Sequence, residues 1–274
     1  MQNESHVDFN QQFSQVSAGF DGRVSYSATF LETGRFLSAG GDLKHATASV
    51  IKLPILVHAL LSVEEGIVAL DQPITLREAE KTPGSGILTH LSDGLTITLR
   101  DACMLMNIIS DNTATNMLID LLGVEAINQR MRNLGLPETT LFRKVFGADP
   151  NISEANLQYG LGVTTPNEMV RLLSLIATDA LGPGVQQTLL REILSKQFYR
   201  EGISRLLSAE YKYEGKTGAV DGVRNDVGIV TTPNGKQIAL AIFCDQMPAP
   251  LWTADNPGLL TIARLAKLVV ESLA

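Results

Sequence analysis

Residues 48–61 read ASVIKLPILVHALL, a run that is apolar on nearly every side of a helix after its first residues. A helix with apolar residues all round is typical of the buried centre of a domain, so this stretch predicts a central helix around which the chain packs. Its charged residue, Lys52, follows Ser49 by three positions. Residues three apart share one face of a helix, so the two side chains are expected to lie side by side near the helix N-terminus.

Ser49 and Lys52 are the residue types that nucleophilic catalysis needs. A serine at a helix N-terminus lies beside unpaired backbone N–H groups and the positive end of the helix dipole, which favour developing negative charge. Its hydroxyl is a weak nucleophile until a neighbouring base takes the proton. Burial among apolar residues would lower the pKa of Lys52 enough for it to be that base. The alternative is a helix-capping serine beside a solvated lysine, and the apolar surroundings argue against it.

Two further motifs follow along the chain, Ser110-Asp111-Asn112 and Lys216-Thr217-Gly218. A serine three residues before a lysine has little meaning alone, because chance often produces it. The three motifs in this order resemble the set found in class A β-lactamases and penicillin-binding proteins. The resemblance extends from about residue 21 to the last helix, and it implies a serine hydrolase that forms an acyl-enzyme.

The resemblance implies a role for the residues of the first two motifs. Ser49 is similar to the family's acylated serine, and Lys52 to its partner lysine. Ser110 resembles the residue that carries a proton to the leaving nitrogen. Asn112 resembles a residue that binds the amide side chain of the substrate.

The third motif and the residues after it resemble the substrate-binding strand edge of the family. Lys216 and Thr217 look like the residues that hold the substrate carboxylate. The backbone N–H groups of Ser49 and Ala219 would form the oxyanion hole. Arg224 resembles an arginine on the neighbouring strand that assists carboxylate binding, although its spacing is one residue shorter. A plain surface arginine on a strand is the alternative for Arg224.

The chain departs from the family in the loop that positions the deacylating water. Counting back without gaps from Pro166 places Asp149 where the family has a glutamate base. A rival alignment with a shortened loop makes Glu154 the base, and a purely structural loop is a third possibility. The family's usual Arg–Asp ion pair falls on Gly147 and Gly162, so both partners are missing together.

Segments with a period of two lie near both ends of the chain, and the residues between them follow a helical pattern. This order predicts an α+β fold, with an antiparallel sheet flanked by N- and C-terminal helices and an inserted all-helical domain of the β-lactamase/transpeptidase-like type. We expect residues 1–47 and 198–274 to form the sheet domain and residues 48–197 the helical domain, with the active site in the cleft between them. The clearest strands are 22–31, 35–39, 227–231 and 237–243.

Two helix starts can be located within the middle segment. Thr98, with Asp101 three residues later, resembles a capping box. Thr165 as N-cap, Pro166 at the first helical position and Glu168 at the third predict the other start.

The composition excludes several classes of protein. Hydrophobic residues make up 45% of the chain and charged residues 19%, as in ordinary globular proteins. A formal net charge of -7 argues against a nucleic-acid partner, because phosphate binding needs clustered Lys and Arg. No apolar run is long enough to span a bilayer, so no membrane association is expected.

The expected partner is a small β-lactam or another acyl-amide or ester substrate, bound by a monomer. The histidines and cysteines show no metal-ligand spacing, so neither a metal nor another cofactor is expected. The first residues do not resemble a signal peptide. The location is therefore open: the protein is either cytoplasmic or a mature periplasmic or secreted form from which the signal has been removed.

Three functions are compatible with these motifs. The first is a β-lactamase, in which Ser49 is acylated by the β-lactam and water then hydrolyses the acyl-enzyme. Deacylation would be slow if Asp149 is the base. The second is a D-alanyl-D-alanine peptidase or an esterase of the same fold. The third is a penicillin-binding sensor that stays acylated. The acidic chain without a membrane anchor favours the β-lactamase.

Overall fold

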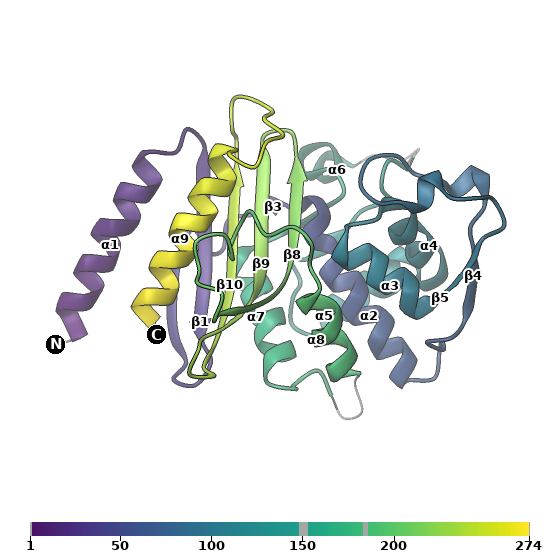
Figure 1. The fold of residues 1–274 in the computed structure, drawn as a ribbon, viewed down its shortest axis with the longest axis horizontal. Helices are drawn as coiled ribbons and strands as arrows, with labels where there is room; N and C mark the ends of the chain where they lie inside the picture. The colour runs from purple at the N-terminus through teal and green to yellow at the C-terminus, as the bar shows by residue number, and fades with distance from the viewer. Residues whose placement is uncertain (1, 148–152, 183–185, 274) are drawn as a thin grey trace.

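A five-stranded antiparallel sheet forms one part of the molecule (Figure 1). The computed structural model describes residues 2–147, 153–182 and 186–273. The strand order is β2-β1-β10-β9-β8, so the first two strands of the chain pair with the last three. The prediction of an antiparallel sheet assembled from both ends of the chain is confirmed. The strands are β1 (Arg23–Phe30), β2 (Arg35–Ala39), β8 (Lys212–Val220), β9 (Val223–Thr231) and β10 (Gln237–Asp245).

Helices cover both faces of this sheet. Alternate side chains of a strand point to opposite faces, and those of β10 belong to two separate cores. One core includes α9 (Pro257–Leu273). Helix α1 (Gln2–Ala18) packs against α9, as Figure 1 shows. The other core includes α7 (Pro166–Ala177), which packs against β1 and β10. Helix α7 lies within residues 48–197, and the proposed division into a sheet domain and a helical domain stays a prediction.

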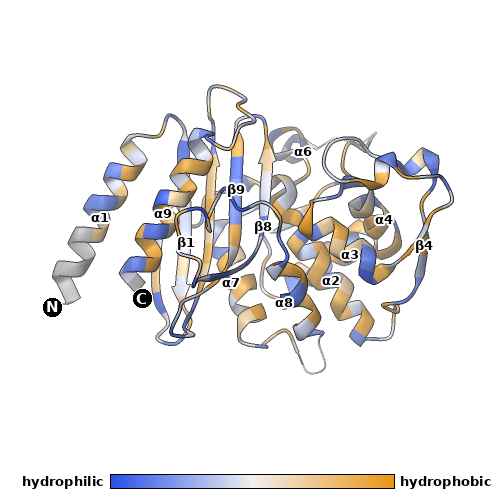
Figure 2. Ribbon diagram, viewed as in Figure 1, coloured by the Kyte–Doolittle hydropathy of each residue, from blue (hydrophilic) through white to orange (hydrophobic). Residues whose placement is uncertain are grey.

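The predicted central helix is α2 (Lys52–Glu64), and its residues from Lys52 to Ser62 are buried. Neighbouring helices surround it, and Figure 2 shows hydrophobic residues concentrated on this group. The apolar circumference of α2 is therefore explained by its position at the centre of the helical part. The helices that contact α2 are α3 (Leu99–Ile108), α4 (Asn112–Leu122), α5 (Val124–Asn133) and α8 (Gln187–Ser195).

The middle of the chain also contains short strands that the helical pattern did not predict. Segments of two or three residues are too short for a period to be recognised, and their pairing partners are distant in sequence. One pair is β4 with β5, and a small separate sheet has the order β3-β7-β6. The bounds are β3 (His45–Ala46), β4 (Pro73–Thr75), β5 (Thr96–Thr98), β6 (Thr140–Leu141) and β7 (Gly162–Thr164).

Both predicted helix starts are confirmed. The Thr98 side chain accepts a hydrogen bond from Asp101 N, and the reciprocal bond completes the capping box of α3. The Thr165 side chain accepts from Glu168 N, and Pro166 is the first residue of α7. A proline at this position loses no helical hydrogen bond, because the first N–H groups of a helix have no partner within it.

Candidate active site

Ser49 lies at a cleft of about 390 Å³ and is half-buried. It belongs to a 3-10 helix, Ala48–Ile51, that directly precedes α2. The serine therefore occupies a tight turn before the α-helix, one step earlier than the predicted helical position. Other predicted site residues that line the same cleft are Ser110, Thr217, Ala219 and Arg224.

Lys52 is fully buried at the start of α2, and its three hydrogen bonds run to the second motif. Its Nζ donates to Ser110 O at 2.7 Å, to Ser110 Oγ at 3.1 Å and to Asn112 Oδ1 at 2.8 Å. Burial lowers the pKa of Lys52 well below its ordinary value, and the positive charge of Lys216 lowers it further. Within the described residues the Ser49 hydroxyl has no hydrogen-bond partner, so it is not held in a ground-state bond to this lysine.

Lys216 is a second fully buried lysine, and like Lys52 it contacts Ser110. Its Nζ donates to Ser110 Oγ at 3.2 Å and to Thr217 O at 2.8 Å. Burial lowers the pKa of Lys216 to about 7, against the opposing effect of Asp226. The Ser110 oxygen accepts from both lysines, which leaves the hydroxyl proton available for a third group. Ser110 is buried but is among the residues that line the cleft, where such a group would bind.

The remaining residues of the second motif shape the wall of the site. Asp111 caps α4 by accepting from Ala114 N at 2.9 Å, and its other oxygen accepts from Ile87 N at 2.7 Å. Asn112 is buried, and its Nδ2 donates to Pro83 O at 2.9 Å. The Asn112 amide therefore connects Lys52 to the loop before residue 84, and its predicted contact with substrate stays a prediction.

Strand β8 is pressed against the turn that carries Ser49, and Gly218 makes this possible. A Cβ atom at residue 218 would lie 2.6 Å from Thr47 O and 3.1 Å from Ser49 N. A side chain there would require β8 and the turn to move apart, so the glycine of the third motif has a steric reason. The next residue, Ala219, lines the same cleft as Ser49, and its predicted oxyanion-hole role stays a prediction.

Arg224 is buried, so its interpretation as a surface arginine is wrong. It pairs with Ala219 across β8 and β9, and it lines the cleft. Its guanidinium lies over the ring of Trp252, with 4.4 Å between Cζ and the ring centroid. Burial lowers the pKa of Arg224, against the effect of Asp221.

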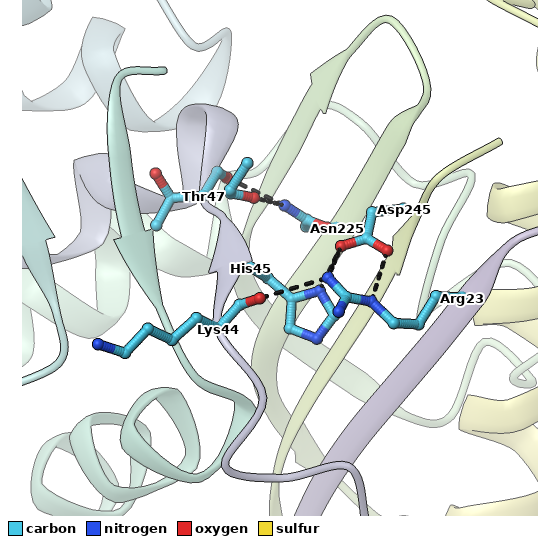
Figure 3. Close-up of polar contacts among 7 residues, drawn as sticks. Arg23, Lys44, His45, Thr47, Asn225 and Asp245 are labelled. Carbon is cyan, nitrogen blue, oxygen red and sulfur yellow. Dashed lines mark hydrogen bonds and ion pairs between the residues drawn. The ribbon is translucent and has the colours of Figure 1, made fainter. Parts of the chain in front are cut away.

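A polar cluster that the sequence did not reveal holds the segment just before Ser49 (Figure 3). Asp245, at the end of β10, accepts from Arg23 Nε at 2.8 Å and Nη2 at 2.5 Å. The same carboxylate lies 2.8 Å from Nδ1 of His45, which is fully buried and stacks on Phe243. A bidentate Arg–carboxylate pair has a defined geometry, and the His45 contact to the same carboxylate attaches β3 to the sheet.

Asn225 completes the attachment of that segment (Figure 3). Its Nδ2 donates to Ala46 O at 2.8 Å and to Thr47 O at 3.1 Å. On the other side, Thr47 N donates to Gly162 O at 2.9 Å. The backbone leading into Ser49 is therefore bonded to β9 on one side and β7 on the other. The residues involved lie more than a hundred positions apart in sequence, so no local motif could have identified them.

Comparison with known proteins identifies the family of the chain. A family model described as "Beta-lactamase enzyme family" matches residues 8–273. The chain belongs to the beta-lactamase enzyme family. Beta-lactamase AER-1 of Aeromonas hydrophila is 25% identical over 267 residues, which are 96% of this chain and 85% of the relative. Beta-lactamase ROB-1 of Haemophilus influenzae is 27% identical over 248 residues, 89% of this chain and 79% of the relative.

Solved structures confirm the beta-lactamase fold. A beta-lactamase from Sphaerobacter thermophilus is 30% identical, with a TM-score of 0.85 over 97% of this chain and 96% of the other. The protein PBP-A is 27% identical, with the same TM-score over 96% and 95% of the two chains. A leucine-to-glutamate variant of PBP-A was solved as an acyl-enzyme complex with penicillin G and matches equally well, at 27% identity over 97% and 96% of the chains.

Asp149 and Glu154 are the two candidates for the loop base of the beta-lactamase family. Asp149 lies outside the described residues. Glu154 is the first residue of α6 (Glu154–Tyr159), is exposed and does not line the cleft. At the expected position of the family's ion pair, Gly162 is closely packed, because a Cβ there would lie 2.7 Å from Thr140 O. A side chain at residue 162 is therefore excluded by the backbone of β6.

Two further properties of this beta-lactamase family member concern ions and membranes. Across residues 2–147, 153–182 and 186–273, the structure contains no group of three or more His, Cys, Asp or Glu side chains placed to hold a metal ion. In the same ranges, none of the helices combines the length and apolar character needed to cross a bilayer.

Proposed function

We propose that this member of the beta-lactamase family hydrolyses the β-lactam amide bond through an acyl-enzyme on Ser49. The observation that carries the proposal is the pair of buried lysines, Lys52 and Lys216, that meet at Ser110 Oγ beside the half-buried Ser49. The names of the curated relatives favour this reaction over a peptidase or an esterase.

Acylation needs a base for Ser49 and an acid for the leaving nitrogen. Burial disfavours the charged form of Lys52. The neutral amine has two N–H donors and one lone pair, so it gives up one of its three hydrogen bonds and uses the lone pair to accept the Ser49 proton as the oxygen attacks the lactam carbonyl. The backbone N–H groups of Ser49 and Ala219 stabilise the oxyanion. When the C–N bond breaks, Ser110 donates its proton to the nitrogen, and Lys52 returns a proton to Ser110. Their contact of 3.1 Å is short enough for that transfer.

Substrate binding is proposed to use the edge of β8. Lys216 and Thr217 hold the substrate carboxylate, with Arg224 adding positive charge from β9. Asn112 donates a hydrogen bond to the acyl side chain of the substrate, using the Nδ2 hydrogen that is not bonded to Pro83 O. Because Lys216 is buried against Ser110, it also influences the proton affinity of the acid in acylation.

Hydrolysis of the acyl-enzyme needs a base that activates water. We assign this role to Asp149, with Glu154 as the alternative. An aspartate carboxylate is withdrawn from a glutamate position by about 1.5 Å, one C–C bond. A displacement of about 1 Å can cost on the order of 10²-fold in rate. Deacylation is therefore expected to limit turnover.

The decisive experiment follows the intact mass of the protein after it is mixed with a penicillin. We expect a rapid gain of one penicillin mass on Ser49 and a slower return to the free mass with release of hydrolysed product. Ser49→Ala should take up no label, while Ser85→Ala, the same change at another serine of the cleft, should still be acylated. Labelling of Ser49→Ala would overturn the proposal.

The same measurement separates the other candidate functions. An adduct that never decays indicates a penicillin-binding sensor. A lasting adduct combined with release of D-alanine from a D-alanyl-D-alanine peptide indicates a peptidase. Absence of any adduct together with cleavage of simple esters indicates an esterase.

A further inference from the structure

Trp252 is exposed to solvent and yet held in place at the cleft. It is the single tryptophan of the chain, it lines the cleft, and 64% of its surface is exposed. Its indole Nε1 donates to Asp221 Oδ1 at 2.9 Å, and its ring lies on the Arg224 guanidinium. A cation over an indole face is attracted by the negative charge of the ring face. Two independent contacts therefore fix the orientation of an exposed ring.

The guanidinium beneath this ring is itself immobilised. Arg224 Nη1 donates to Val220 O and to Val223 O, both at 2.7 Å, and Nη2 donates to Leu251 O at 2.5 Å. These carbonyls belong to the turn between β8 and β9 and to the segment before α9. An arginine has five N–H donors, so two remain for a ligand. Arg224 and Trp252 thus form one rigid platform, with a charge at its base and an aromatic ring above it.

The platform lies beside the residues proposed to bind the substrate carboxylate. Arg224 pairs with Ala219, and Thr217 and Ala219 line the same cleft as Trp252. The segment before α9 is also bonded to Arg205, which donates to Ala254 O and to Asp255 Oδ1, the latter at 2.8 Å. A ligand whose carboxylate lies at β8 therefore has Trp252 next to the part of the molecule that bears this carboxylate.

We propose that Trp252 and Arg224 form a subsite for a flat apolar substituent on the carboxylate-bearing ring of a β-lactam. This inference rests on the proposed function and names the substrate class that the site prefers. A flat group gains stacking and apolar burial on an indole that is already ordered, so little side-chain entropy is lost on binding. A small aliphatic substituent at the same position leaves the ring exposed.

The test compares two β-lactams with the same nucleus and acyl side chain. One carries an aryl-vinyl group on the ring carbon next to the carboxylate-bearing carbon, and the other carries a methyl group there. We expect Trp252→Ala to lower kcat/KM for the aryl substrate about 5- to 10-fold more than for the methyl substrate. Trp252→Phe should restore most of the difference, since it keeps an aromatic face over Arg224.

Phe198→Ala provides the matched control. Phe198 is an aromatic residue with 71% exposure that does not line the cleft, so its removal should leave the ratio of the two substrates unchanged. A second readout uses Ser49→Ala, which binds without reacting. The aryl compound should quench the fluorescence of the single tryptophan to saturation, and the methyl compound should do so only at higher concentration.

The outcomes distinguish this inference from the proposed function. If the wild-type protein reacts with neither substrate, the proposed β-lactam hydrolysis is wrong. If it reacts with both, and Trp252→Ala lowers both rates equally, Trp252 only supports Arg224 and the subsite is rejected. Quenching that is equal for the two compounds also rejects the subsite.

Discussion

Lys216 Nζ lies 3.2 Å from Ser110 Oγ, although 106 residues separate the two in sequence. The contact joins strand β8 to Ser110, which lies two residues before α4. Ser110 has a φ of 57°, a left-handed conformation that a serine rarely adopts, so its hydroxyl position is held by the surrounding structure. We therefore expect the ionisation of Lys216 to act both on the proposed substrate binding and on the acid of the proposed acylation.

Neutralising Lys216 should discriminate between substrates. We expect Lys216→Ala to lower kcat/KM for a carboxylate-bearing β-lactam on the order of 10²-fold, because a buried charged partner of the anion is lost. The loss for a neutral ester should be much smaller. Equal losses on the two substrates would reject carboxylate binding and leave Lys216 as a residue that tunes Ser110.

Binding of an anionic substrate should weaken as the pH rises through about 7. Burial lowers the pKa of Lys216 to about 7, so the side chain is a cation below that pH and neutral above it. Burial raises the pKa of Asp226 to about 7, and its charge on deprotonation opposes proton loss from Lys216. We expect KM for a carboxylate-bearing β-lactam to rise between pH 6 and 8.

Asp226→Asn offers a sharper form of the same measurement. Without the Asp226 charge, the pKa of Lys216 should fall further, and the rise in KM should begin at lower pH. A neutral ester should show no such rise in either protein. A KM for the anionic substrate that stays constant from pH 6 to 8 would contradict the assignment of Lys216.

Adding one methyl group at Gly218 should damage the site. A Cβ there would lie 2.6 Å from Thr47 O and 3.0 Å from Val50 N, so Gly218→Ala must push apart β8 and the Ser49 turn. We expect the acylation rate to fall on the order of 10²-fold, together with a lower melting temperature. Gly19→Ala is the control, because its Cβ would meet no atom closer than 4.0 Å. If Gly218→Ala is acylated at the same rate as the wild-type protein, the strand and the turn can separate without loss of activity, and the prediction is wrong.

The two candidate bases make opposite predictions for the acyl-enzyme. We expect Asp149→Asn to trap the adduct and Asp149→Glu to speed its release, because the longer carboxylate reaches the water. Glu154→Gln should change the deacylation rate little, consistent with the exposure of Glu154 at the start of α6. Time-resolved intact mass measures all three. A trapped adduct in Glu154→Gln with normal turnover in Asp149→Asn would establish the shortened-loop alignment instead.

Much of the fold could be predicted from the sequence, since local patterns encode it. The apolar circumference of residues 51–61 predicted a central helix, and α2 is buried there. Thr98 and Thr165 predicted helix starts because a capping side chain bonds its own first turn. The order of the three motifs indicated one cleft, and Ser49, Ser110 and the β8 edge line it together.

By itself, then, the sequence determined the family, the sheet built from both chain ends, and the residue types at the site. Only the tertiary structure decided which groups meet. Lys52 was expected beside Ser49 through helical spacing, yet its hydrogen bonds run to Ser110 and Asn112. The Asp245–His45 contact and the Arg224–Trp252 platform likewise join segments distant in sequence. Periodicity and capping act within a few residues, whereas these contacts depend on how whole strands and helices pack.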